Sequence, residues 1–233
     1  MNLATEIPNW KSAVTKIKNI LISNPNLGIK ANLFGDIYKG KRGLMVVDVV
    51  CSRQRNYDKR VLADLLPQYE SRAKDLSLKS LSMSAPTYLI NSEEPLTMQR
   101  VAQKIMDFGF KNSLENEDEI CNRWACSDTY WLMLEINGIG PVLLEYLRML
   151  CGVDTIKLDV NVGKALEVLG IATRGYPQNI VLMICNQLAK DVGCTLIELD
   201  QALFQLGQSV KKSKIRVERF GLADATGLKV IKR

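Results

Sequence analysis

Apolar residues recur at helical spacing along most of the chain, and short polar segments with glycine or proline separate the apolar stripes. Residues three, four and seven positions apart share one face of a helix, so this spacing predicts amphipathic helices. The clearest predicted helices cover residues 9–21, 97–108 and 195–206, and further helices begin near Asn116 and Pro177. No internal repeat or low-complexity tract interrupts the pattern.

Length and composition set the scale of the fold. The chain has 233 residues, of which 47% are hydrophobic, enough to bury a core in one compact domain or in two small lobes. No stretch approaches the length of a membrane span, and the opening segment MNLATEIPNWKSAV lacks the basic flank and continuous apolar core of a signal peptide. We therefore expect a cytoplasmic protein without membrane contact.

The supply of reactive side chains limits the chemistry. The six cysteines form no C-x-x-C pair and the chain has no histidine, so we expect reduced thiols and no zinc site. The missing histidine also excludes Ser-His and Cys-His catalysis. Asp and Glu carboxylates remain as candidates for general acid–base catalysis.

Positive charge is concentrated at the C-terminus. The net charge is +6, and residues 211–233 carry eight Lys or Arg against Glu218 and Asp224, which leaves residues 1–210 balanced. Such a basic tail can neutralise DNA phosphates and make binding sensitive to salt. It is equally compatible with a solvated terminus that aids solubility.

A glycine hairpin follows the apolar run that ends at Ile136. The segment reads NGIGP and includes Gly138, Ile139 and Gly140; apolar residues at helical spacing resume after Pro141. This pattern predicts two short helices joined by a glycine turn. The exposed N–H groups and the positive dipole end of the second helix can bind a phosphate without reading sequence. Ordinary helical hairpins contain the same G-x-G pattern.

The stretch from Trp131 to Leu169 resembles the helix-hairpin-helix, endonuclease III-like superfamily of DNA glycosylases. In that family an Asp stands at the start of the helix that follows the hairpin, and here that residue is Asp159. The resemblance extends over roughly residues 30 to 210 and is most specific from the hairpin to this Asp. Its pattern is most similar to that of the mismatch-type glycosylases.

The resemblance implies an all-α fold with two lobes and an active cleft between them. Residues 30–152 would form a central helical barrel that ends in the hairpin. Residues 1–29 and 153–210 would form the second lobe, and residues 211–233 the basic tail. The β-branched residues of Leu44–Cys51 favour a strand by propensity, and only the resemblance makes this segment a helix.

Two further segments share the resemblance. Leu44–Arg60 is similar to the family segment that contacts DNA opposite the flipped base, which makes Gln54 a candidate for filling the hole left by base flipping, with Arg53 and Arg55 as phosphate contacts. Asp107–Phe110 is similar to a glycine-containing turn whose bulky residue wedges into the duplex. Phe110 is thus a second insertion candidate, although an aromatic residue at that place is also typical of a core.

Asp159 is the first candidate catalytic residue. Cleaving an N-glycosidic bond builds positive charge on the sugar, and a fixed carboxylate stabilises that charge and orients water. Asp is also a favoured N-cap, and Asp159 precedes an apolar helical stretch. One residue can fill both roles.

Relatives that also nick DNA place a Lys shortly after the hairpin glycines, where this chain has Val142. The resemblance therefore implies a monofunctional enzyme with little lyase activity. Lys157 could substitute, but we interpret it as a solvated loop lysine that contacts a phosphate. Asn161 replaces a His that is common in relatives.

Asp48 is the second candidate catalytic residue. It stands in an apolar stretch, where burial of a carboxylate is unfavourable without a partner and raises its proton affinity. An acidic residue occupies this position in the mismatch-type branch, which implies contact with the flipped base or its protonation. The alternative is a structural salt bridge with Arg42, Arg53 or Lys104.

The sequence thus predicts a monofunctional DNA glycosylase that removes a damaged, mismatched or modified base from double-stranded DNA and leaves an abasic site. We expect a nucleoid-associated monomer without metal or cofactor. No cysteine follows Cys194, so the iron–sulfur cluster of many relatives should be absent. The alternatives are a noncatalytic DNA-binding protein and a glycosylase with abasic-site lyase activity. The sequence does not identify the excised base.

Overall fold

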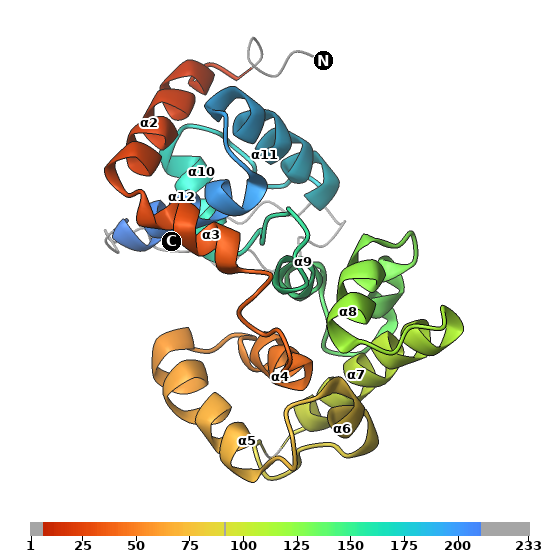
Figure 1. The fold of residues 1–233 in the computed structure, drawn as a ribbon. Coiled ribbons are helices and arrows are strands. Elements are labelled where there is room, and N and C mark those ends of the chain that lie inside the picture. Colours follow the sequence, from red (N-terminus) through yellow and green to blue (C-terminus); the bar gives the residue numbers. More distant parts are fainter. Residues whose placement is uncertain (1–6, 91, 211–233) are drawn as a thin grey trace, which may run out of the picture.

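The computed structural model describes residues 7–90 and 92–210, and within these ranges the regular structure is entirely helical (Figure 1). The predicted all-α class is confirmed for this part of the chain. The basic tail, residues 211–233, lies outside the described residues. In chain order the helices are α2 (Trp10–Ser23), α3 (Asn26–Leu33), α4 (Arg42–Cys51), the π-helix η1 (Tyr57–Leu65), α5 (Leu66–Arg72), α6 (Leu78–Met83), α7 (Glu94–Lys111), α8 (Glu117–Cys126), the 3₁₀ helix η2 (Tyr130–Glu135), α9 (Pro141–Leu150), α10 (Val160–Val168), α11 (Gln178–Val192) and α12 (Leu196–Ser209).

Two of the helix starts read from the sequence are confirmed by side-chain caps, whereas α7 begins at Glu94, three residues before the predicted start at residue 97. Asn116 caps α8, because its side chain accepts hydrogen bonds from the backbone N–H groups of Asp118 and Glu119. Thr195 and Glu198 form a reciprocal capping box at α12. Pro177 directly precedes α11.

The ambiguous segment Leu44–Cys51 is helical. It lies within α4, and every residue of α4 is buried. A helix satisfies its own backbone N–H and C=O groups, so it can be surrounded by other helices on every side. This burial outweighs the preference of the valines for strands. The start of α4 also requires glycine, because a Cβ on Gly43 would lie 2.3 Å from the carbonyl oxygen of Ser77.

The predicted turn at Asp107–Phe110 is wrong. These residues continue α7, which ends at Lys111. Gly109 is needed for packing rather than for a turn, because a Cβ there would lie 2.6 Å from Cδ1 of Ile120 in α8. Phe110 is 87% exposed, so the alternative of a buried core aromatic is also wrong.

Two hydrophobic cores organise the helices. One is formed by buried residues between Tyr38 and Cys151, on η1, η2 and the helices from α4 to α9. The other is formed mainly by α2, α10, α11 and α12. Figure 1 shows α3 and α9 where the two groups of helices meet. There Ala31, Met149 and Ile197 make a small third cluster that joins α3, α9 and α12.

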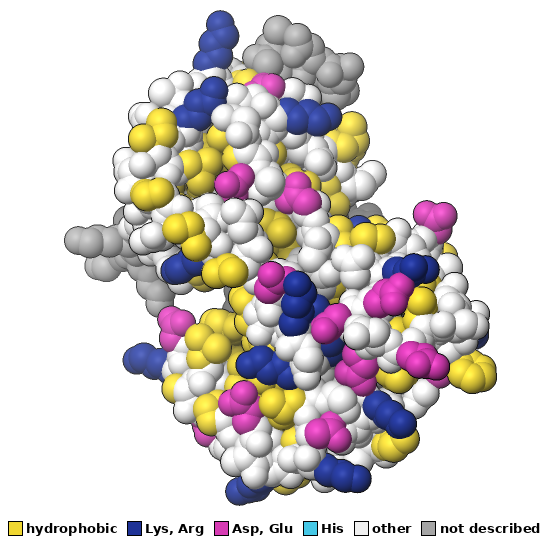
Figure 2. Space-filling model, viewed as in Figure 1, with side chains coloured by type: hydrophobic (Ala, Val, Ile, Leu, Met, Phe, Trp, Pro, Cys, Tyr) yellow, Lys and Arg dark blue, Asp and Glu magenta, His cyan; other side chains and the backbone are white. Residues whose placement is uncertain are grey.

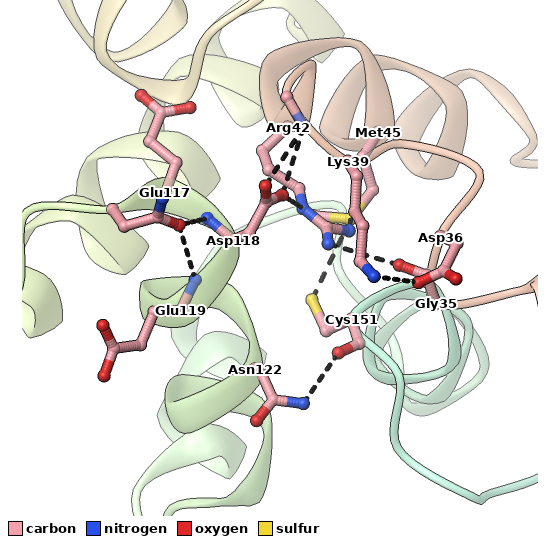
Figure 3. A network of polar contacts seen from close by, with 12 residues as sticks. Gly35, Asp36, Lys39, Arg42, Met45, Glu117, Asp118, Glu119, Asn122 and Cys151 are labelled. Atoms are coloured by element: carbon pink, nitrogen blue, oxygen red, sulfur yellow. Dashed lines mark hydrogen bonds and ion pairs between the residues drawn. The ribbon is translucent and has the colours of Figure 1, made fainter.

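Arg42 fixes the position of α4 (Figure 3). Its guanidinium group is almost fully buried and forms an ion pair with Asp118 of α8, with 2.6 Å between Nε and Oδ1. It also donates to the carbonyl oxygens of Leu150 in α9, at 2.9 Å, and Gly35 in the loop after α3, at 3.2 Å. A buried arginine requires such partners. Arg42 therefore holds α4 against α8, α9 and the α3–α4 loop.

Among the described residues, no single helix is long and apolar enough to cross a membrane. Only α11 and α12 taken together reach the required length and composition, and they meet at an angle of 100°.

Candidate active cleft

Both candidate acids line one cleft of about 640 Å³. Asp48 comes from α4, within the first core, whereas Asp159 directly precedes α10, within the second. The remaining walls come from the α3–α4 loop, η1, α9 and α12. Residues far apart in the sequence and on the two groups of helices thus meet at one site.

Asp48 is fully buried and is surrounded by tyrosine hydroxyl groups. Its Oδ2 accepts hydrogen bonds from Tyr38 at 2.7 Å and from Tyr57 and Tyr146 at 3.0 Å each. Its Oδ1 has no hydrogen-bond partner among the described residues. The hydroxyl groups of Tyr57 and Tyr146 also lie within 3.3 Å of each other. Asp48 therefore has one saturated and one unoccupied carboxyl oxygen.

The salt-bridge alternative for Asp48 is wrong. Arg42 pairs with Asp118, and Lys104 pairs with Glu135 at 2.7 Å. Arg53 lines a different surface depression, beside the glycine hairpin. Three neutral hydroxyl groups, rather than a cation, hold the Asp48 carboxyl group.

Burial raises the pKa of Asp48, and the three tyrosine hydrogen bonds and the charge of Lys157 lower it only in part. Burial and the nearby carboxylate raise the pKa of each tyrosine as well, so the hydroxyl groups remain donors. Since Oδ2 already accepts three hydrogen bonds, the proton of a neutral Asp48 belongs on Oδ1. Oδ1 is itself buried from solvent.

Asp159 caps α10 and still faces the cleft. Its backbone is extended, and its Oδ1 accepts from the N–H groups of Asn161 at 2.8 Å and Val162 at 3.0 Å. The predicted N-cap is confirmed. Its Oδ2 makes no hydrogen bond to any described residue, and the side chain is partly exposed. The cap fixes the carboxylate and leaves one oxygen for a ligand.

Lys157 lies inside the cleft rather than in a solvated loop, which corrects its predicted environment. Its Nζ lies 4.1 Å from the centre of the Tyr146 ring, and its side chain is only partly exposed. The face of an aromatic ring attracts a cation. Lys157 forms no ion pair with another described residue, so its charge remains available to a substrate.

The residues of the cleft that sequence reasoning missed include Tyr38, Tyr146 and Asp200. Asp200 is buried in α12, and burial raises its pKa to about 7. The sequence carried one indication that Asp200 is buried, because this residue directly follows Leu199 in an apolar helix. The tyrosines gave no such signal, since they approach Asp48 only in the folded chain.

The glycine hairpin has the predicted place but a different first helix. The segment before it is the 3₁₀ helix η2, and the second helix is α9, which begins at Pro141. Gly138 has a φ of +97°, a conformation that favours glycine. The backbone N–H groups of Gly140 and Val142 donate to no described backbone group. They are available to an anion at the start of α9.

A depression of about 490 Å³ separates the hairpin from the turn after α4. Arg53 and Gln54 line it from one side, and Gly138 lines it from the other. Gln54 has a φ of +53°, which is rare for a residue with a side chain. Arg55 lines both this depression and the cleft, so the two are adjacent. Its guanidinium group is already paired with Glu94 at 2.8 Å.

Phe110 is not brought to this site. Thr97, near the start of α7, donates to the carbonyl oxygen of Asn137 in the hairpin at 2.9 Å. Phe110 lies thirteen residues further along the same helix, which corresponds to about 20 Å. Of the two insertion candidates, the structure brings only Gln54 to the depression beside the hairpin.

Charge on the visible face is mixed. Figure 2 shows Lys and Arg side chains interspersed with Asp and Glu, without a continuous basic surface on that face. This agrees with the charge balance of residues 1–210. No group of Cys, Asp and Glu side chains among the described residues is arranged to hold a metal ion.

Searches against protein-family models, curated proteins and solved structures found no match to this chain. The residues of the cleft themselves must therefore indicate its chemistry.

Proposed function

We propose that this protein is a monofunctional DNA glycosylase. It would flip a damaged, mismatched or modified base out of double-stranded DNA and hydrolyse the N-glycosidic bond, leaving an abasic site. The observation that carries the proposal is the convergence of Asp48 and Asp159 on one cleft, in two different environments. The proposal includes the two-lobed helix-hairpin-helix glycosylase arrangement, which the two hydrophobic cores support.

The two acids suit the two ends of the bond that breaks. Loss of the base leaves positive charge on the sugar, and an ionised Asp159 with a free Oδ2 stabilises that charge and orients water. The departing base becomes a better leaving group when it is protonated. Asp48 lines the cleft and has a raised pKa, so as a neutral acid it can recognise the base and donate that proton.

The surface beside the cleft suits a DNA backbone. The N–H groups at the start of α9 can bind a phosphate, and Gly138, Ile139 and Gly140 shape that approach. Arg53 is exposed next to the hairpin. Gln54 is held in a strained conformation at the same place, where it can enter the space left by a flipped base.

The experiment that tests this function compares the wild type with Asp159→Asn on duplexes that contain uracil, G·T, A·8-oxoguanine, alkylated or glucosylated bases. Asparagine also caps helices well, so the substitution removes the charge and keeps α10 in place. Asp191→Asn is the matched control, because Asp191 accepts a hydrogen bond from Trp10 at 2.7 Å and does not line the cleft.

We expect DNA nicks that appear only after alkali treatment, from the wild type and Asp191→Asn but not from Asp159→Asn. DNA binding should be equal in all three proteins. Binding without base release on every duplex would contradict the proposal and favour a noncatalytic DNA-binding protein. Nicks that form without alkali would instead indicate a lyase.

A further inference from the structure

Asp200 is a buried acid next to the proposed catalytic carboxylate. It lies on α12, is 6% exposed and lines the cleft with Asp159. Its Oδ1 accepts a hydrogen bond from the backbone N–H of Lys157 at 3.0 Å, and its Oδ2 accepts one from the side chain of Gln201 at 3.3 Å. Neither role assigned to Asp48 or Asp159 explains this burial.

The hydrogen bond from Lys157 holds a tight turn. The N–H of Asp159 donates to the carbonyl oxygen of Lys157 at 2.7 Å, which closes a three-residue turn. The side chains at both ends of this turn, Lys157 and Asp159, line the cleft. The carboxyl group of Asp200 on α12 thus holds the backbone of this turn. The side chains of Lys157 and Asp159 project from that backbone into the cleft.

Two other contacts hold the same segment against α12. The N–H of Ile197 donates to Oδ1 of Asp154 at 3.1 Å. Gly207 allows close approach to Asn161, because a Cβ there would lie 2.1 Å from the Asn161 carbonyl oxygen. Asp200 lies between these contacts along α12, and its side chain lines the cleft.

We propose that Asp200 is a positioning residue for base excision, which holds the Lys157–Asp159 turn so that Asp159 faces the sugar. The inference rests on the proposed glycosylase function. Asp200 acts through the turn and need not touch the reacting atoms.

The charge of Asp200 makes this support depend on pH. Burial raises its pKa to about 7, the Lys157 backbone N–H lowers the pKa, and the charge of Asp159 raises it. Lys157, whose charge lowers the pKa of Asp200, and Cys185 of α11 also face it. A hydrogen bond to an ionised carboxylate is roughly twice as strong as one to a neutral carboxyl group. The turn is therefore held more firmly above pH 7 than below it.

Single-turnover base release at saturating protein, measured from pH 6 to pH 8, tests the proposal with Asp200→Asn and Asp200→Ala. Asparagine keeps an acceptor oxygen but cannot ionise. We expect Asp200→Asn to match the wild type at pH 6 and to fall behind it above pH 7. Asp200→Ala should lose about tenfold at pH 8 and less at pH 6, at unchanged DNA affinity. Asp191→Asn should follow the wild type throughout.

The proposal is overturned if Asp200→Ala releases base at the wild-type rate, or if Asp200→Asn has the wild-type pH profile. A readout without activity separates this result from failure of the glycosylase function itself. The NMR shift of the Lys157 backbone amide should titrate near pH 7 in the wild type and not in Asp200→Asn. Absence of that titration in the wild type would also overturn the proposal, even if no duplex yields a free base.

Discussion

Asp48 and Asp159 are both aspartates of one cleft, yet their surroundings differ in almost every respect. Asp48 is fully buried and held by three tyrosine hydroxyl groups, whereas Asp159 is partly exposed and held by two backbone N–H groups at a helix start. Burial favours the neutral acid at Asp48, whereas the cap contacts hold the Asp159 carboxyl group in place. Two residues of the same type can thus take different roles because their environments differ. In our proposal Asp48 is the proton donor and Asp159 stabilises the charge on the sugar.

The largest expected effect comes from Asp159→Asn, which removes the anion from this pair. Loss of one preorganised electrostatic contact to a transition state lowers the rate by about 10² to 10³. The melting temperature should hardly change, because asparagine also caps α10. Single-turnover base release and thermal unfolding measure the two quantities. A rate within a factor of two of the wild type would remove Asp159 from the mechanism.

Asp48→Asn tests the other half of the comparison, with an expected loss of about 10². Asparagine has nearly the same shape but cannot donate a carboxyl proton. The loss should be greatest for bases that leave slowly without protonation and small for bases that already carry positive charge. Rates on both kinds of duplex check this. Equal losses on all bases would mean that Asp48 acts only in binding.

Tyr57→Phe tests the acid role of Asp48 through the pH dependence of base release. The hydroxyl group of Tyr57 lowers the pKa of Asp48, so its removal should raise that pKa further. The proton-donating form of Asp48 would then persist to higher pH, and the alkaline limb of the rate profile should move upward. Loss of one hydrogen bond should also reduce stability by about 1 kcal/mol. A downward shift of that limb would contradict the acid role of Asp48.

Lys157→Met should have a smaller effect. The contact between this cation and the Tyr146 ring contributes about 0.5 to 2 kcal/mol to stability, so its loss should lower the free energy of unfolding by about that amount. A monofunctional glycosylase forms no Schiff base between a lysine and the sugar. Borohydride should therefore trap no covalent complex between the wild type and abasic DNA, and efficient trapping that Lys157→Met abolishes would show a lyase instead.

Stability should also depend on the buried acid beside Asp159. Burial raises the pKa of Asp200 from 3.8 to about 7, so the folded state retains this proton where the unfolded state has lost it. Its contribution to stability is complete below pH about 4 and is lost as pH rises towards 7. Asp200→Asn should therefore gain stability relative to the wild type between these values. Unfolding in denaturant at pH 5 and pH 8 measures the difference.

Part of this architecture could be predicted from local sequence signals. Capping residues and apolar periodicity located α8, α11 and α12, because each signal acts within one turn of the helix it starts. The same reasoning failed at Gly109, where the constraint is contact with Ile120 in another helix. Glycine alone does not distinguish a turn from close helix packing.

The residues of the candidate site also differ in whether a local sequence signal identifies them. Asp159 could be found because its cap and its distance from the hairpin are local in sequence. The hydrogen bonds of three tyrosines to Asp48 could not be predicted, since the tyrosines come from three separate segments and meet only in the folded chain. Lys157 was located in the correct loop, but its contact with Tyr146 depends on how α9 packs beside that loop.

The most direct test of the central claim is detection of the released base. Mass spectrometry would quantify free base after incubation of each modified or mismatched duplex with the wild type, Asp48→Asn, Asp159→Asn or Asp191→Asn. The account predicts that the wild type and Asp191→Asn release the same base from at least one duplex, and that both cleft variants are at least tenfold slower. Equal release by the two cleft variants and the wild type would contradict it, as would DNA binding with no release from any duplex.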